Sequence, residues 1–124
     1  MRVLDAGHLY ELASLDGGDV RILRFVKRMG PKYPGNDWAY GGTTSQEVLR
    51  ALIDRARYLN AQIPCAETEA IIGNLQTALL LFEIRAARVH GRPLDLPSLR
   101  DFERLVPCAH CLHVECKEFV GVAP

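Results

Sequence analysis

The sequence lacks most of the features that assign a function directly. Its 124 residues carry 15 Lys+Arg and 15 Asp+Glu, so the formal net charge is zero and no basic surplus favours a long nucleic-acid backbone. No catalytic triad, carboxylate pair or dinucleotide fingerprint can be assembled from it, and we therefore expect no enzymatic activity. A small anionic ligand is still compatible with this composition, because it needs only a local cluster of cations.

Long hydrophobic runs and export signals are also lacking. No apolar run approaches the roughly 20 residues that span a bilayer, and the N-terminus does not have the basic-then-apolar order of a signal peptide. We therefore expect a cytoplasmic protein without membrane contact. In that reducing compartment the four cysteines favour free thiols or a metal site over disulfides.

The residues that are present predict a small α+β protein. The content of 48% hydrophobic and 24% charged residues is that of an ordinary globular protein, and the length suits a single domain. An antiparallel β-hairpin is predicted over residues 8–28, where two strand-like runs flank Asp16-Gly17-Gly18-Asp19. A Gly/Pro-rich loop follows over residues 29–43.

The most basic segment of the chain lies in this hairpin and loop. Five cations fall between Val20 and Asn36 with no acid among them, namely Arg21, Arg24, Lys27, Arg28 and Lys32. Two interpretations remain open. The cations can gather around something negative, or their stems can lie on apolar surface while their heads point to water.

A long antiparallel two-helix hairpin is predicted over residues 44–91. Thr44-Ser45-Gln46-Glu47 fits a capping box, Pro64 suits the first turn of the second helix, and His90-Gly91 ends it. Cys65, at the corner, is expected to be a small buried residue. Apolar residues cover most of the second helix, which a two-helix hairpin and two strands cannot bury, so we infer burial by other copies of the chain.

Residues 92–124 form a C-terminal extension, in which the sequence predicts a short helix over residues 94–106 and then a Cys/His-rich tail. Zinc takes four soft ligands in tetrahedral geometry, and the tail offers Cys108, Cys111, His113 and Cys116. A structural zinc and free thiols are the two alternatives for this tail. No other cofactor is expected.

Three stretches of the chain resemble one known family. They are LYELASLDGG followed by LRFVKR, then GTTSQEVLRALIDRARYLNAQIPC, then LQTALLLFEIRAARVHGR. Together they run from near Leu9 to Arg92, and the second is the most specific. They resemble phage-encoded anti-defence proteins, the "sponges" that sequester nucleotide second messengers of the Thoeris and CBASS bacterial immune systems.

The resemblance implies binding without chemistry. In that family the helical hairpin is the common core, chains form homo-oligomers, typically hexamers, and the ligand is held between protomers. It implies a protein of the infected bacterial cytoplasm that sequesters cyclic oligonucleotides or cyclic ADP-ribose-type molecules. By position, it nominates Arg24, Phe25, Lys27, Arg28, Thr43, Thr44, Arg55, Arg85 and Arg88 as ligand-binding residues, with Tyr10 an alternative to Phe25 for stacking on a base.

The chain also departs from the family pattern. It reads Arg85-Ala86-Ala87-Arg88 where the family reads Arg-Thr-x-Asp/Asn-Arg, so one hydroxyl donor is missing and the choice of nucleotide is open. The cysteine-rich tail has no counterpart in the family core. The alternative function is a protein-binding module of phage origin that recognises its partner through a zinc-bound tail.

Overall fold

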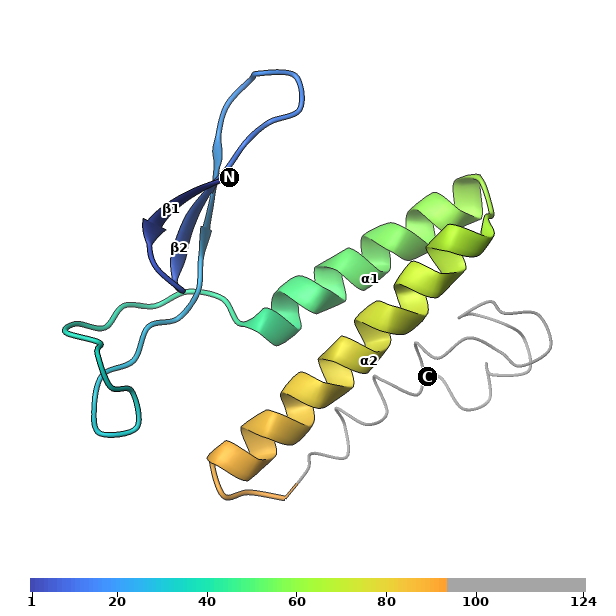
Figure 1. The fold of residues 1–124 in the computed structure, drawn as a ribbon. Coiled ribbons are helices and arrows are strands. Elements are labelled where there is room, and N and C mark those ends of the chain that lie inside the picture. The colour runs from blue at the N-terminus through green and yellow to red at the C-terminus, as the bar shows by residue number, and fades with distance from the viewer. Residues whose placement is uncertain (94–124) are drawn as a thin grey trace. The chain divides into compact units, whose positions relative to one another are not determined.

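The structure, a computed structural model, describes residues 1–93 and contains a three-stranded sheet followed by two helices (Figure 1). The α+β class is therefore confirmed for these residues. Contacts divide the chain into two compact units, one over Met1–Ser45 and one that begins at Gln46. The single folding domain stays a prediction, because compactness does not measure folding cooperativity. The predicted third helix and the Cys/His tail lie outside the described residues.

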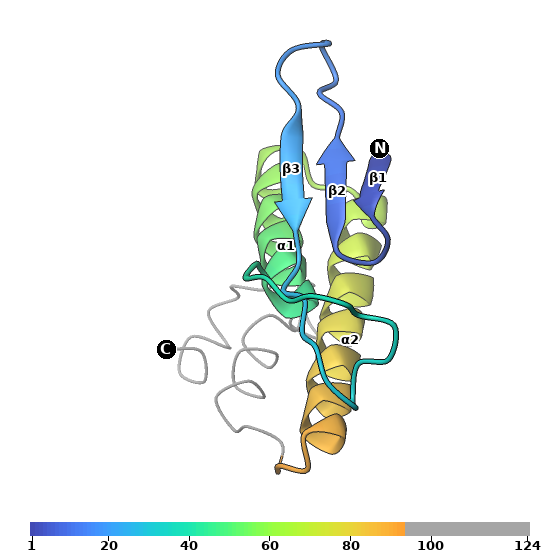
Figure 2. The same ribbon diagram turned by 90° about the vertical axis from the view of Figure 1, so that its left-hand side faces the viewer.

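The sheet is antiparallel, with strands in the order β1-β2-β3 (Figure 2). β1 spans Arg2–Asp5, β2 spans Leu9–Leu12 and β3 spans Arg21–Arg24. The hairpin prediction found β2 and β3 but made both too long, and it missed β1. All three strands have four residues, but the Asp-Gly-Gly turn indicated β2 and β3. The place of β1 depends on pairing with β2, where Arg2 Nε lies 2.9 Å from Glu11 Oε2.

The chain that leaves β3 pairs with the end of the predicted Gly/Pro-rich loop. The amide of Val26 donates to the carbonyl of Thr43 at 2.9 Å, and Lys27 and Tyr40 exchange two backbone hydrogen bonds of 3.0 Å. Gly42 makes this approach feasible, because a Cβ there would lie 2.5 Å from the carbonyl oxygen of Arg24. The two ends of the loop are therefore held together, which orders the residues between them.

The two helices begin and end close to the predicted residues. α1 spans Ser45–Gln62 and α2 spans Ala66–Val89. At the end of α2, Gly91 has a φ of 63°, its amide donates to the carbonyl of Arg88, and the amide of Arg92 donates to the carbonyl of Ala87 at 2.9 Å. These two bonds form a Schellman motif, so the predicted glycine stop is confirmed.

The corner between the helices differs from the prediction. Cys65 is the N-cap of α2, so Pro64 lies one residue before the cap and not in the first helical turn. Cys65 is also exposed, and the prediction that it is buried is wrong. Its backbone is extended, outside the helical turn, and its Sγ lies 2.9 Å from Thr68 Oγ1 instead of entering the contact between the helices.

The contact between α1 and α2 combines apolar and polar residues. Ala56 of α1 and Ile72 of α2 form a buried cluster with Leu75 packed against it, and Asn60 Nδ2 donates to Glu69 Oε1. Four further residues of the two helices are buried, namely Ile53, Gln76, Leu79 and Ala87. Two leucines of α1 stay exposed, Leu52 by 45% and Leu59 by 41%. Arg50 Nη2 and Glu83 Oε1, 3.2 Å apart, form an ion pair across the two helices.

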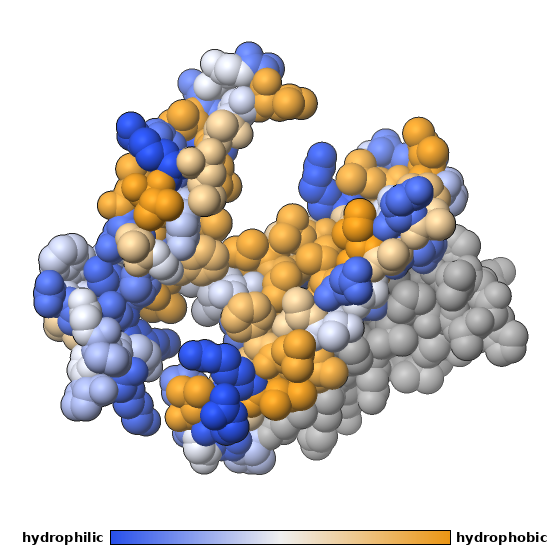
Figure 3. Space-filling model, in the orientation of Figure 1, coloured by the Kyte–Doolittle hydropathy of each residue, from blue (hydrophilic) through white to orange (hydrophobic). Residues whose placement is uncertain are grey.

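The outer surface of α2 is unusually apolar for a helix exposed to water. Large hydrophobic side chains remain accessible along it, with Leu81 60% exposed and Ile71 49% exposed, and Figure 3 shows apolar side chains across the helices. By length and composition α2 is also apolar enough to cross a bilayer, contrary to the prediction that no run is. A single such helix carries little weight, because the core helix of a soluble protein meets the same criterion.

Candidate anion-binding site

A partly buried ion pair lies in the first unit. The ammonium of Lys27 is 2.8 Å from Asp5 Oδ2, and the hydroxyl of Tyr40 donates to the same oxygen at 2.5 Å. Lys27 is only 6% exposed. The pairing of β1 with β2 brings in Asp5, and the bridge between Lys27 and Tyr40 brings in the other two, so three separate segments meet at one carboxylate.

The pKa values of two groups in this cluster follow from these contacts. The hydrogen bond from Lys27 and then that from Tyr40 hold the pKa of the Asp5 carboxyl below its ordinary value. Desolvation, together with the bond to Asp5, raises the pKa of Tyr40 to about 12. Asp5 is therefore ionised and Tyr40 protonated at neutral pH, which keeps the cluster intact.

Aromatic rings surround the two cations of this cluster. The ammonium of Lys27 lies 4.3 Å from the ring centroid of Trp38 and 5.7 Å from that of Tyr40. The guanidinium of Arg24 also lies over Tyr40, at 5.7 Å. These are cation–π distances, so the rings hold both side chains in place even though Arg24 is exposed.

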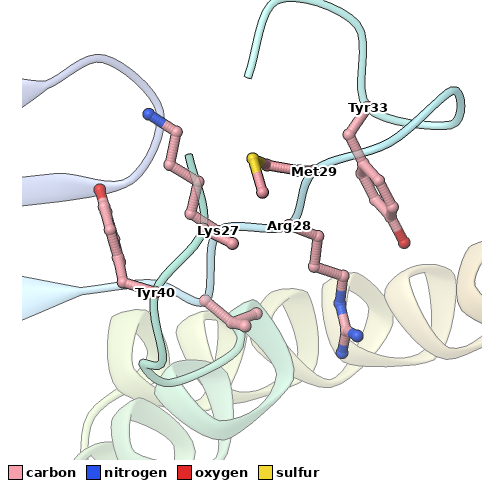
Figure 4. Close-up of a pocket in the computed structure, with 7 residues that line it drawn as sticks. Lys27, Arg28, Met29, Tyr33 and Tyr40 are labelled. Atoms are coloured by element: carbon pink, nitrogen blue, oxygen red, sulfur yellow. The ribbon is translucent and has the colours of Figure 1, made fainter. Parts of the chain in front are cut away.

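A pocket of about 540 Å³ opens beside Lys27 in the same unit (Figure 4). Its lining residues come from the chain just after β3 and from the loop that folds back on it, namely Val26, Lys27, Arg28, Met29, Tyr33, Ala39 and Tyr40. Two cations and two phenol rings therefore border one hollow.

Five candidate arginines share one property. Each is exposed, and none forms an ion pair with another residue of the range 1–93; they are Arg24, Arg28, Arg55, Arg85 and Arg88. By contrast, Arg2 pairs with Glu11 and Arg50 pairs with Glu47 and Glu83. The positive charge of the five is thus not compensated by any carboxylate in the described part of the chain.

The other candidates have contacts of their own within the first unit. Lys27 is committed to Asp5. Phe25 is half-buried and meets Tyr10 edge-to-face, with ring centroids 6.1 Å apart. The amide of Thr43 donates to the carbonyl of Arg24 at 2.8 Å, so it is occupied, and Thr44 lies exposed just before α1.

The structure groups the candidates within each unit. Arg24, Phe25, Lys27, Arg28 and Thr43 all lie where β3 continues into its bridge with the returning loop. Arg85 and Arg88 lie in the C-terminal half of α2, while Arg55 lies in the middle of α1.

No family model, curated protein or solved structure matches the chain.

Sequence reasoning missed Asp5, Tyr33, Trp38 and Tyr40. The available signal was the aromatic run Trp38-Ala39-Tyr40 within a loop of about fifteen residues, a length that is often functional. No comparable signal pointed to Asp5, because its partners lie 22 and 35 residues away.

The proposed zinc ligands cannot be placed. Cys108, Cys111, His113 and Cys116 lie outside the described residues. Within residues 1–93 no group of three or more His, Cys, Asp or Glu side chains is close enough to hold a metal ion. The zinc site and the protein-binding alternative that depends on it stay predictions.

Proposed function

We propose that this chain is a non-enzymatic, homo-oligomeric protein that binds signalling nucleotides in the phage-infected cytoplasm and sequesters them intact. Its ligands are cyclic oligonucleotides or cyclic ADP-ribose-type molecules, as the family resemblance implies. One observation carries the proposal, namely the five exposed arginines without a carboxylate partner in the described residues. Each can contact a phosphate without first breaking an ion pair.

Arginine suits this role physically. Its guanidinium is always charged and offers two parallel N–H donors, which match two phosphate oxygens. The competing explanation is that these are ordinary solvated surface arginines, and for Arg88 that it complements the negative end of α2. The two explanations differ in whether removal of an arginine changes ligand affinity.

The apolar surface of α2 supports assembly. Leu81, Phe82 and Ile84 are 60%, 38% and 44% exposed, and three such side chains within about one helical turn are costly to leave in water. A second copy of the chain would cover this surface. The hexamer is taken from the resemblance.

A capture experiment tests the function. The purified full chain is incubated with cyclic di- and trinucleotides and glycocyclic ADP-ribose, filtered, and then heat-denatured to release what it holds. We expect at least one ligand to disappear from the filtrate and to return chemically unchanged. An altered product would indicate an enzyme, and a complete lack of uptake would reject the proposal.

Matched variants test the arginines. We expect Arg24→Gln and Arg85→Gln each to weaken capture by about tenfold or more, the effect of losing one charge-assisted hydrogen bond. Arg2→Gln is the control, because Arg2 is already paired with Glu11. Equal capture by all three variants would show that Arg24 and Arg85 are solvated surface residues that do not contact the ligand.

A further inference from the structure

The pocket beside Lys27 contains one unbalanced charge. Arg28 lines it and has no ion pair within residues 1–93, whereas the neighbouring Lys27 is neutralised by Asp5 at 2.8 Å. No acidic residue of the described chain lines the pocket. The pocket therefore carries one net positive charge and favours a ligand with one anionic group.

The walls of the pocket suit a flat aromatic ring. Tyr33 lies on one side and Tyr40 with Lys27 on the other, with Met29 and Arg28 between them (Figure 4). Phenol rings and thioethers both make favourable contacts with π systems, and stacking tolerates any base. The hollow is shallow and open to solvent, and its volume of about 540 Å³ leaves room for one such ring.

The backbone around the pocket leaves its side chains free for a ligand. The carbonyl of Arg28 accepts a hydrogen bond of 2.8 Å from Asn36 Nδ2, and the amide of Tyr33 donates to the carbonyl of Gly30 at 2.9 Å. Neither the guanidinium of Arg28 nor the phenol of Tyr33 bonds to another described residue. The loop is thus held by main-chain contacts while both functional side chains remain available, a preorganised arrangement.

We propose that this pocket holds one nucleotide unit within a single chain, with the base against Tyr33 and Met29 and the phosphate on Arg28. The proposal rests on the proposed function for the class of ligand. It goes beyond that function because the pocket is complete in one chain and needs no residue from a partner. Lys27, clamped by Asp5, is a positioning residue that shapes the wall.

A ligand series measures each part of this proposal. The full chain is titrated with adenosine 5′-monophosphate, adenosine and ribose 5-phosphate, and binding is followed by calorimetry and by the fluorescence of Trp38. Trp38 is the single tryptophan and lies beside Lys27, so its emission reports on this unit. We expect the monophosphate to bind about tenfold or more tightly than either fragment, because only it engages both Arg28 and the rings.

Two pairs of variants test the residues. Arg28→Gln should weaken binding of adenosine 5′-monophosphate about tenfold or more, whereas Lys32→Gln, an exposed cation of the same loop that does not line the pocket, should leave it unchanged. Tyr33→Leu should weaken it about fivefold or more, whereas Tyr33→Phe, which keeps the ring, should not. Circular dichroism melting checks that each variant is folded.

The outcomes separate this proposal from the proposed function. No binding of the monophosphate, or equal binding by Arg28→Gln and Tyr33→Leu, would overturn the pocket even if the chain captures cyclic ligands. Conversely, binding with the expected variant pattern would support the pocket even if the capture experiment fails.

Discussion

At the scale of single residues, the carboxylate of Asp5 links β1 to Lys27 and Tyr40 of the first unit. It accepts hydrogen bonds from Lys27 and Tyr40, which lie 22 and 35 residues further along the chain. Removing one partner from a largely buried ion pair leaves the other charge uncompensated, which costs more than the pair contributes. Asp5 is therefore the residue on which the geometry around the pocket depends.

The lowered pKa of Asp5 predicts an acid-sensitive contribution to stability. Because its pKa falls below the ordinary value of 3.8 on folding, the contribution is fully present above about pH 4 and is lost as the pH falls through the lowered pKa. We expect Asp5→Asn to lower the melting temperature at pH 7. The difference from the wild type should then shrink as the pH falls from 4 to 2.

Melting followed by circular dichroism measures this difference at each pH. Asp37→Asn, an exposed acid in the nearby loop, is the control and should show no such gap. A gap between wild type and Asp5→Asn that stayed constant down to pH 2 would contradict the role assigned to the Asp5 carboxylate.

The raised pKa of Tyr40 predicts the opposite behaviour in alkali. With a folded-state value of about 12 against an ordinary 10.0, its contribution is present below pH 10 and is lost as the pH rises through 12. Phenolate absorbance of the folded chain should show a transition near pH 12 that is missing from Tyr40→Phe. A transition near pH 12 that persists in this variant would belong to another tyrosine.

Gly42 is the second residue with a specific structural requirement. A Cβ at this position would lie 2.5 Å from the carbonyl oxygen of Arg24 and 2.6 Å from the carbonyl carbon of Phe25, and both are backbone atoms. We expect Gly42→Ala to destabilise the protein by about 1–3 kcal/mol, the usual cost of overpacking. Gly41→Ala is the matched control, because a Cβ at Gly41 meets nothing within 4 Å. Chemical denaturation measures both, and equal stability of the two variants would contradict the close approach.

At the scale of elements, the two helices are joined by a polar contact that the apolar pattern did not reveal. Asn60 in α1 is buried, its Nδ2 donates to Glu69 Oε1 at 2.5 Å, and its Oδ1 accepts from the amide of Cys65 at 3.1 Å. The Asn60 side chain of α1 thus provides an acceptor for the backbone N–H of Cys65, the N-cap residue of α2. The Cys65 side chain makes no cap bond of its own.

Replacing Asn60 tests this connection. We expect Asn60→Ala to lower the free energy of unfolding by about 2 kcal/mol, since a capping bond is lost and a buried carboxylate oxygen of Glu69 loses its donor. Gln62→Ala, an exposed position at the end of α1, should change it by less than about 0.5 kcal/mol. Urea denaturation separates the two, and a neutral Asn60→Ala would show that water replaces both bonds.

α2 also contains a buried amide without a partner among the described residues. Gln76 is 2% exposed, and its Nε2 has no hydrogen-bond acceptor within residues 1–93. Ile72 and Leu79, one turn on either side, are almost completely buried. An apolar pattern alone would not predict a buried glutamine at this position.

At the scale of the whole molecule, the proposed assembly depends on α2. Leu81→Glu places a charge on its most exposed leucine, at 60%, and burial of such a side chain contributes about 1.5–3 kcal/mol per copy. We expect sedimentation equilibrium to give an oligomer for the wild type and a smaller species for Leu81→Glu.

Leu15→Glu provides the control for assembly. Leu15 is fully exposed in the loop between β2 and β3, away from α2 in the sequence, so this variant should keep the wild-type mass. A monomeric wild type would contradict the proposal that other copies of the chain cover α2.

Local features were predictable from the sequence because they depend on neighbours along the chain. The start of α1 at Ser45 agrees with the capping-box pattern Thr44-Ser45-Gln46-Glu47. The end of α2 follows from Gly91, whose positive φ other residues rarely adopt. The paired strands β2 and β3 were found for the same reason, since a Gly-containing turn joins them. The nucleotide ligand, the oligomer and the zinc tail stay predictions.

Tertiary structure alone decided which groups meet. No local sequence pattern indicates three of these contacts. They are the pairing of β1 with β2, the bonds of the Asp5 carboxylate to Lys27 and Tyr40, and the pocket at Arg28 and Tyr33. Tertiary structure also determined that Lys27 is paired while Arg28 next to it is not. The backbone bridge between Lys27 and Tyr40 brings the Lys27 ammonium to Asp5, whereas no carboxylate of residues 1–93 pairs with Arg28. Two neighbouring cations that look alike in the sequence therefore differ in their partners once the chain folds.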